Sequence, residues 1–126
     1  MAAMELIHTC YRITDPTASV AFYEALGFEK RRELPIRDEA INIFMGVPGE
    51  ALPELELTYN HGVDSYDIGT AFGHIALGVP DAYAACDKIK TAGGNVTREA
   101  GPVKGGTTVI AFVTDPDGYK IELIQR

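Results

Sequence analysis

The chain has 126 residues, of which 46% are hydrophobic and 23% charged, and its formal net charge is −7 at pH 7. This composition is that of a folded protein, and the length suits one domain or two small halves that share a core. The acidic balance disfavours nucleic acid as a partner. No apolar run reaches the roughly 20 residues that a transmembrane helix needs. We therefore expect a cytoplasmic protein with neither a nucleic-acid nor a membrane partner.

The two cysteines, Cys10 and Cys86, do not belong to a Cys-x-x-Cys pair. This spacing argues against a disulfide framework and against a zinc ribbon. We expect both to be small buried hydrophobic residues.

The first half of the chain is predicted to fold as βαβββ. Residues 6–13 have the apolar and aromatic character of a strand, and Asp15 and Pro16 suit the N-cap and first position of a helix. Apolar residues then recur at helical spacing up to Gly27, a typical left-handed C-terminal cap, which predicts a helix over 16–26. Short strands are expected at 28–34, 40–45 and 55–59.

The second half repeats this order after a polar linker, residues 61–71. A strand over 72–79 leads to Pro80-Asp81, which opens a helix that closes at Gly93-Gly94. Further strands are expected at 95–99, 107–114 and 119–124. The predicted fold class is α+β, a single domain over residues 1–126 made of two βαβββ modules at about 5–60 and 72–125.

Polar residues inside apolar runs recur at one fixed distance along the chain. His8 returns 66 positions later as His74, and Glu56 returns as Glu122, each glutamate lying between two aliphatic residues. The same distance relates Asp15 to Asp81 and Gly27 to Gly93. A repeat that keeps its His, Glu, Asp and Gly positions indicates two copies of one module.

A carboxylate in mid-strand between aliphatic neighbours needs a cation, because an unpaired buried charge costs roughly several kcal/mol. One such His or Glu alone is more often a satisfied core histidine or a solvent-facing carboxylate. All four positions obey one repeat, so we interpret His8, Glu56, His74 and Glu122 as the ligands of one metal ion. Two imidazoles and two carboxylates suit octahedral Ni²⁺, Co²⁺, Mn²⁺ or Fe²⁺ and leave two positions for water or substrate, and Zn²⁺ is also possible.

Four segments of the sequence resemble bacterial glyoxalase I, of the vicinal oxygen chelate superfamily. They are Glu56-Leu57-Thr58-Tyr59-Asn60, Gly73-His74-Ile75-Ala76-Leu77, Gly93-Gly94-Asn95-Val96-Thr97-Arg98-Glu99 and Asp115-Pro116-Asp117-Gly118-Tyr119-Lys120-Ile121-Glu122-Leu123. The resemblance covers nearly the whole chain. It implies the paired βαβββ fold, a homodimer, and metal ligands at the four positions that the repeat had selected. The short chain is more similar to the nickel- or cobalt-activated bacterial class than to the zinc-dependent class.

The resemblance also implies a reaction, the isomerisation of the hemithioacetal of methylglyoxal and glutathione to S-D-lactoylglutathione through an enediolate. This reaction detoxifies methylglyoxal, and it makes glutathione a co-substrate. Glu122 is the candidate base for the proton transfer, with Glu56 as the alternative. By the same resemblance, Arg12 and Asn60 contact the γ-glutamyl end of the thiol. Lys104 lies on a Gly-rich loop from which it can reach the glycine carboxylate, and the alternative is a solvated loop without a ligand.

Two other functions stay open at this point, an acyl-CoA epimerase of the same superfamily and a non-catalytic small-molecule-binding protein. Epimerases usually carry Gln at the place of Glu56, and a binding protein would be expected to lose the metal ligands. We therefore favour lactoylglutathione lyase. We expect a homodimer in which His8 and Glu56 of one chain meet His74 and Glu122 of the other.

Overall fold

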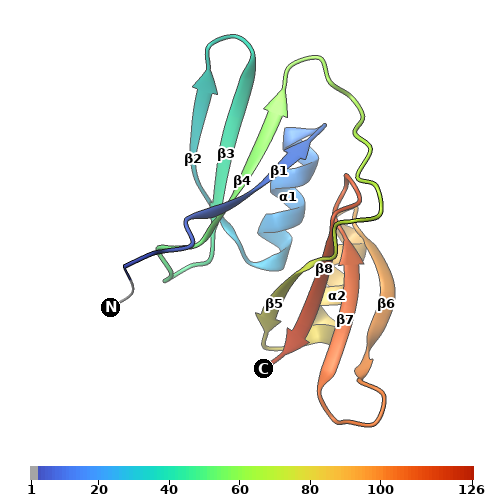
Figure 1. Ribbon diagram of the computed structural model, residues 1–126. Coiled ribbons are helices and arrows are strands. Elements are labelled where there is room, and N and C mark those ends of the chain that lie inside the picture. Colours follow the sequence, from blue (N-terminus) through green and yellow to red (C-terminus); the bar gives the residue numbers. More distant parts are fainter. Residues whose placement is uncertain (1–2) are drawn as a thin grey trace. The chain divides into compact units, whose positions relative to one another are not determined.

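The computed structural model describes residues 3–126 and consists of two βαβββ units, with the boundary between Tyr66 and Asp67 (Figure 1). The first unit contains β1 (His8–Ile13), α1 (Pro16–Leu26), β2 (Glu29–Ile36), β3 (Ala40–Gly46) and β4 (Glu54–Asn60). The second contains β5 (Ile75–Val79), α2 (Ala82–Thr91), β6 (Asn95–Pro102), β7 (Val109–Thr114) and β8 (Lys120–Gln125). The predicted order of elements and the α+β class are confirmed. None of the helices in the described part of the chain is long and apolar enough to span a membrane.

Each unit forms a four-stranded mixed sheet with the same topology. The strand order is β1-β4-β3-β2 in the first unit and β5-β8-β7-β6 in the second. The first strand runs parallel to the last, and the remaining neighbours are antiparallel. The last strand of each unit therefore lies in the interior of its sheet, beside the strand that precedes the helix.

The aspartates and glycines of the repeat define the ends of the helices. Asp15 accepts a hydrogen bond from the Ala18 amide at 3.2 Å, and Asp81 accepts one from the Ala84 amide at 3.0 Å, as N-caps do. Gly27, with a φ of 113°, is the C-cap of α1, whereas the C-cap of α2 is Ala92 and Gly93 follows it with a φ of 88°. These contacts are the physical reason why the same residue types recur at this point of each module.

The strands bury one face and expose the other. On β4 the buried residues include Leu55 and Leu57, and on β8 they include Ile121 and Leu123. Because side chains alternate along a strand, Glu56 and Glu122 lie on the opposite face of their sheets. The predicted placement of both carboxylates on the open face is confirmed by this burial pattern.

Two expectations from the sequence are wrong. Strand β5 begins at Ile75, so His74 immediately precedes the strand instead of lying within it. Pairing between β5 and β8 begins one residue later, at Ile75 with Ile121, although Lys120 opposite His74 already belongs to β8. Cys10 is exposed, since it shares the open face of β1, while Cys86 is buried as expected and its pKa is raised by that burial.

A buried carboxylate ties β2 to β4 in the first unit. Glu54 has only 5% of its side chain exposed and receives two hydrogen bonds from the Arg32 guanidinium, both at 3.0 Å. Arg31 lies 3.6 Å from the same carboxylate. The hydrogen bonds from Arg32 lower the pKa of Glu54 below its usual range, against the opposing effect of burial.

Replacing Glu54 with Gln is expected to lower the free energy of unfolding by about 1–3 kcal/mol at pH 7, because two arginines lose their buried partner. A carboxyl group whose pKa is lowered in the folded state stabilises the fold above its unfolded pKa, near 4.3, and loses that effect as the pH falls further. The difference between wild type and Glu54→Gln in urea unfolding, followed by circular dichroism, should therefore shrink below about pH 4.5.

Glu99→Gln is the matched control, because Glu99 forms an exposed ion pair with Lys90. It should change stability by less than about 1 kcal/mol. A Glu54→Gln protein as stable as the control would show that the Arg32–Glu54 pair does not hold the two strands together.

Candidate metal centre

The first predicted pair of ligands is brought together within the first unit. His8 opens β1 and Glu56 lies in the middle of β4, its parallel neighbour. The imidazole Nε2 of His8 lies 3.6 Å from Oε2 of Glu56. The side chains are 39% and 15% exposed, so the pair is accessible from the open face of the sheet.

The second pair has the same arrangement in the second unit. Nε2 of His74 lies 3.2 Å from Oε1 of Glu122, and the side chains are 40% and 19% exposed. The sequence repeat thus corresponds to a repeat of geometry, with one imidazole and one carboxylate side by side on each open face. Among the residues that the structure describes, no group of three or more His, Cys, Asp or Glu side chains forms a metal site. Each unit therefore offers two ligands, which is half of the predicted set.

A phenylalanine beside each pair was not predicted from the sequence. Phe44 is the register partner of Glu56 and contacts the His8 ring edge to face, with centroids 6.1 Å apart. Phe112 is the register partner of Glu122 and contacts His74 in the same way at 5.2 Å. The two phenylalanines are 68 positions apart because the loop before β4 is longer than the turn before β8, so a search at a distance of 66 misses them. Pairing the strands before comparing the halves would have found them.

The surroundings of Glu56 are polar. The Thr58 hydroxyl donates to Oδ1 of Asn42 at 2.9 Å and lies 3.5 Å from Oε1 of Glu56. Cys10, the register partner of Glu56, has its sulfur 3.4 Å from the same hydroxyl. Partial burial is the main cause that raises the pKa of the Cys10 thiol, which favours its neutral form next to the carboxylate.

The surroundings of Glu122 are apolar by comparison. Its register partners are Ala76 on β5 and Phe112 on β7, and Ile124 follows it on the same face of β8. Ile124 occupies the position of Thr58 in the other unit, and its register partner Ile110 that of Asn42. The two carboxylates thus occupy equivalent positions in unlike environments.

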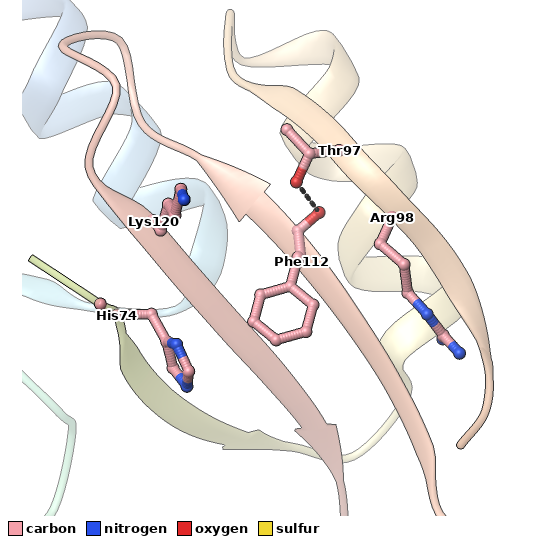
Figure 2. A pocket seen from close by; sticks show the side chains of 6 residues that line it. His74, Thr97, Arg98, Phe112 and Lys120 are labelled. Carbon is pink, nitrogen blue, oxygen red and sulfur yellow. Dashed lines mark hydrogen bonds between the residues drawn. The ribbon is translucent and has the colours of Figure 1, made fainter. Parts of the chain in front are cut away.

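A cavity of about 390 Å³ opens next to His74 on this face of the second unit. Figure 2 shows the His74 and Phe112 rings facing it, with Lys120 from β8 and with Thr97 and Arg98 from β6. The Thr97 hydroxyl donates to the carbonyl oxygen of Phe112 at 3.2 Å, which fastens β6 to β7 at the cavity wall.

Residues 5–123 match the Glyoxalase/Bleomycin resistance protein/Dioxygenase superfamily. The chain belongs to this superfamily. The chain is 54% identical to the lactoylglutathione lyase of Haemophilus influenzae, over 98% of this chain and 93% of that protein. It is 55% identical to the lactoylglutathione lyase of Escherichia coli O157:H7 over the same shares of the two chains. These relatives confirm the resemblance to bacterial glyoxalase I.

Solved glyoxalase structures have the same fold. Glyoxalase I from Zea mays superimposes with a TM-score of 0.89 at 49% identity, over 96% of this chain and 44% of the maize chain. The present chain therefore spans less than half of the length of that protein. The trypanothione-dependent glyoxalase I of Leishmania major superimposes with a TM-score of 0.82 at 36% identity, over 98% and 87% of the two chains.

The residues predicted to bind the thiol lie at separate places on this glyoxalase chain. Arg12 lies on β1, on the same face as His8, and Asn60 ends β4 and donates from Nδ2 to the Tyr66 hydroxyl at 2.9 Å. Lys104 is exposed in the turn between β6 and β7. Arg12 and Asn60 thus share the open face of the first unit, and Lys104 belongs to the second.

Proposed function

We propose that this chain is a metal-dependent lactoylglutathione lyase, which isomerises the hemithioacetal of methylglyoxal and glutathione to S-D-lactoylglutathione. The observation that carries the proposal is the His–Glu pair at equivalent strands of both units, in a chain about half identical to bacterial lactoylglutathione lyases. Thioester absorbance should rise when methylglyoxal and glutathione are added to metal-loaded protein. Thiols other than glutathione form a second arm of this assay, since a trypanothione-dependent relative has the same fold.

The proposed metal ligands are His8, Glu56, His74 and Glu122. Their chemistry fits a divalent ion, because two imidazole nitrogens and two carboxylates form a set typical of six-coordinate Ni²⁺ or Co²⁺, which we favour, and Zn²⁺ also accepts these donors. When bound, such an ion supplies Lewis-acid stabilisation of the negative charge that develops on the adjacent oxygens of the substrate. A second carboxylate distinguishes this set from the two-His, one-carboxylate set of iron dioxygenases.

We assign the proton transfer to Glu122 and a fixed ligand role to Glu56. A base must take a proton from one substrate carbon and return it to the next, so its carboxylate has to move between positions. Glu56 lies in polar surroundings, 3.5 Å from the Thr58 hydroxyl. Glu122 has the apolar side chains Ala76 and Ile124 beside it, and apolar surroundings favour proton uptake by a carboxylate. The two equivalent glutamates can therefore divide the tasks of ligand and base.

The proposed active unit is a homodimer whose sites draw ligands from both chains. Each unit supplies only one His and one Glu, so a set of four requires a second unit to face the first. The family resemblance implies that this unit comes from another chain, so that the first unit of one chain meets the second unit of its partner. We expect the dimer to act in the cytoplasm.

Purified protein should bind about one Ni²⁺ or Co²⁺ per chain, measured by metal analysis after dialysis. His74→Ala and Glu56→Ala should each weaken metal binding by ten- to a hundredfold or more, because each removes one of four protein ligands. His61→Ala is the matched control, since His61 is exposed and its ring contacts Tyr59 outside the two pairs. Unchanged metal affinity in both ligand variants would contradict the proposed site.

Glu122→Gln should retain the fold and abolish proton transfer, because the amide can approach the ion but cannot accept a proton from carbon. We expect kcat to fall by far more than tenfold, a change of about 1.4 kcal/mol in activation free energy. Exchange of the substrate C–H proton with deuterated solvent, followed by NMR, reports the same step directly. A kcat above about a tenth of the wild-type value would place the base on another residue.

Mixing two inactive proteins, His8→Ala and Glu122→Gln, tests the shared site. Subunit exchange would give heterodimers in which one site carries both substitutions and the other carries neither, so activity should return. The control is each variant taken through the same exchange alone. An inactive mixture, with exchange verified by mass spectrometry of the native dimers, would mean that each site belongs to one chain.

A further inference from the structure

The two units differ in charge at the start of their last strands. We call this place the corner of the open face: it contains Glu54 and Arg32 in the first unit, and Lys120 and Arg98 in the second. Glu54 is in register with His8 and lies two residues before Glu56. Lys120 occupies the equivalent position 66 residues later, two residues before Glu122 on β8. Arg32 and Arg98 also correspond, because each is the register partner of a phenylalanine, Phe44 or Phe112. Each corner thus has an arginine and a phenylalanine. The corner of the first unit also has the negatively charged Glu54, and the corner of the second has the positively charged Lys120.

In the first unit this corner is closed and its charges are paired. Arg32 donates both hydrogen bonds to Glu54, and its guanidinium carbon lies 4.0 Å from the centroid of the Phe44 ring. The carboxylate of Glu54 is nearly inaccessible, and Arg31 is a second cation beside it. The charge of Arg32 at this corner is therefore already neutralised by Glu54.

In the second unit the same corner is open and positively charged. The Arg98 guanidinium donates to the carbonyl oxygens of Glu99 at 3.2 Å, Gly101 at 2.9 Å, Ile110 at 2.8 Å and Pro102 at 3.0 Å, so its hydrogen bonds serve the backbone of β6 and β7. Lys120 is exposed, and it forms no ion pair with any carboxylate in the described range 3–126. The 390 Å³ cavity lies between these two cations and His74 (Figure 2).

We propose that Lys120 binds the glycine carboxylate of the thiol substrate in this cavity and so contributes to thiol specificity. The inference rests on the proposed lactoylglutathione lyase function. Glutathione carries two carboxylates, and the γ-glutamyl one is assigned to Arg12 on the first unit by the family resemblance. Lys120, beside the second His–Glu pair, offers a cation for the other carboxylate, that of glycine. Lys104, predicted for this role from the sequence, lies in the exposed turn and does not line the cavity.

The cavity walls suit this task. The Phe112 ring gives the cavity an apolar wall, and apolar surroundings strengthen the attraction between an ammonium group and a carboxylate. Lysine carries its charge on a flexible stem with three rotatable donors, so it can follow the end of a peptide-like ligand. Arg98, held by four backbone carbonyl groups, adds positive potential while its hydrogen bonds stay with the backbone.

The test compares two inert ligands, S-methylglutathione and its glycine amide, which lacks the carboxylate charge. Calorimetric titration of the nickel-loaded full chain should show that Lys120→Met weakens binding of the acid about tenfold, as for a charge-assisted hydrogen bond. Binding of the amide should change by less than about twofold. Lys88→Met, on the exposed side of α2, is the matched control and should leave both affinities unchanged.

The same titrations are repeated with Lys120→Gln, which has a polar side chain. If one of the two variants folds poorly, the other still tests the inference. In turnover, both variants should raise KM while kcat changes little. Equal losses for acid and amide, or no loss for either, would overturn the inference. A loss that follows the γ-glutamyl carboxylate, tested with an analogue lacking that group, would assign Lys120 to the other end and overturn it too. Wild-type protein that neither binds S-methylglutathione nor turns over would contradict the proposed function itself.

Discussion

The two-residue period of the β-strands is the constraint on which this structure depends. In each unit the last strand alternates leucine or isoleucine toward the core with glutamate toward the open face. The aliphatic neighbours are completely or almost completely buried, so a slip of one residue would move the carboxylate into the core at a cost of several kcal/mol, roughly. Packing of the core therefore sets the position of the chemistry on the other face.

Much of this arrangement could be predicted from the sequence, because its signals are local. Asp15 and Asp81 cap helices in the structure as their spacing indicated, and the apolar runs became strands within a few residues. The His and Glu positions stood out because polar residues in apolar runs are rare and all four obeyed one distance. Bringing His8 to within 3.6 Å of Glu56 also required β1 and β4 to be neighbours in the right register, which the structure shows and the order of elements along the chain does not specify.

The features that were missed depend on pairing between strands, which a fixed distance along the chain does not describe. Phe44 and Phe112 occupy equivalent places, but loops of different length shift one of them by two positions in the sequence. His74 immediately precedes β5, because the pairing of β5 with β8 begins at Ile75, and the apolar run around His74 does not reveal where pairing starts. Cys10 was expected in the core from its residue type alone, whereas the alternation of β1 places it on the open face beside Thr58.

The differences between the units carry as much information as the repeat. A metal ion is spherically symmetric, so two equivalent units can each present the same His–Glu pair to it. The proposed substrate has unlike ends and two unlike carbons, and recognising it requires that the symmetry be broken around the ligands. The structure breaks it at two places: polar Thr58 and Asn42 against apolar Ile124 and Ile110 beside the glutamates, and Glu54 against Lys120 beside the histidines. In the proposed function, the first difference distinguishes a ligand from a base, and the second distinguishes a corner whose arginine is paired with Glu54 from one where Lys120 is available to an anion.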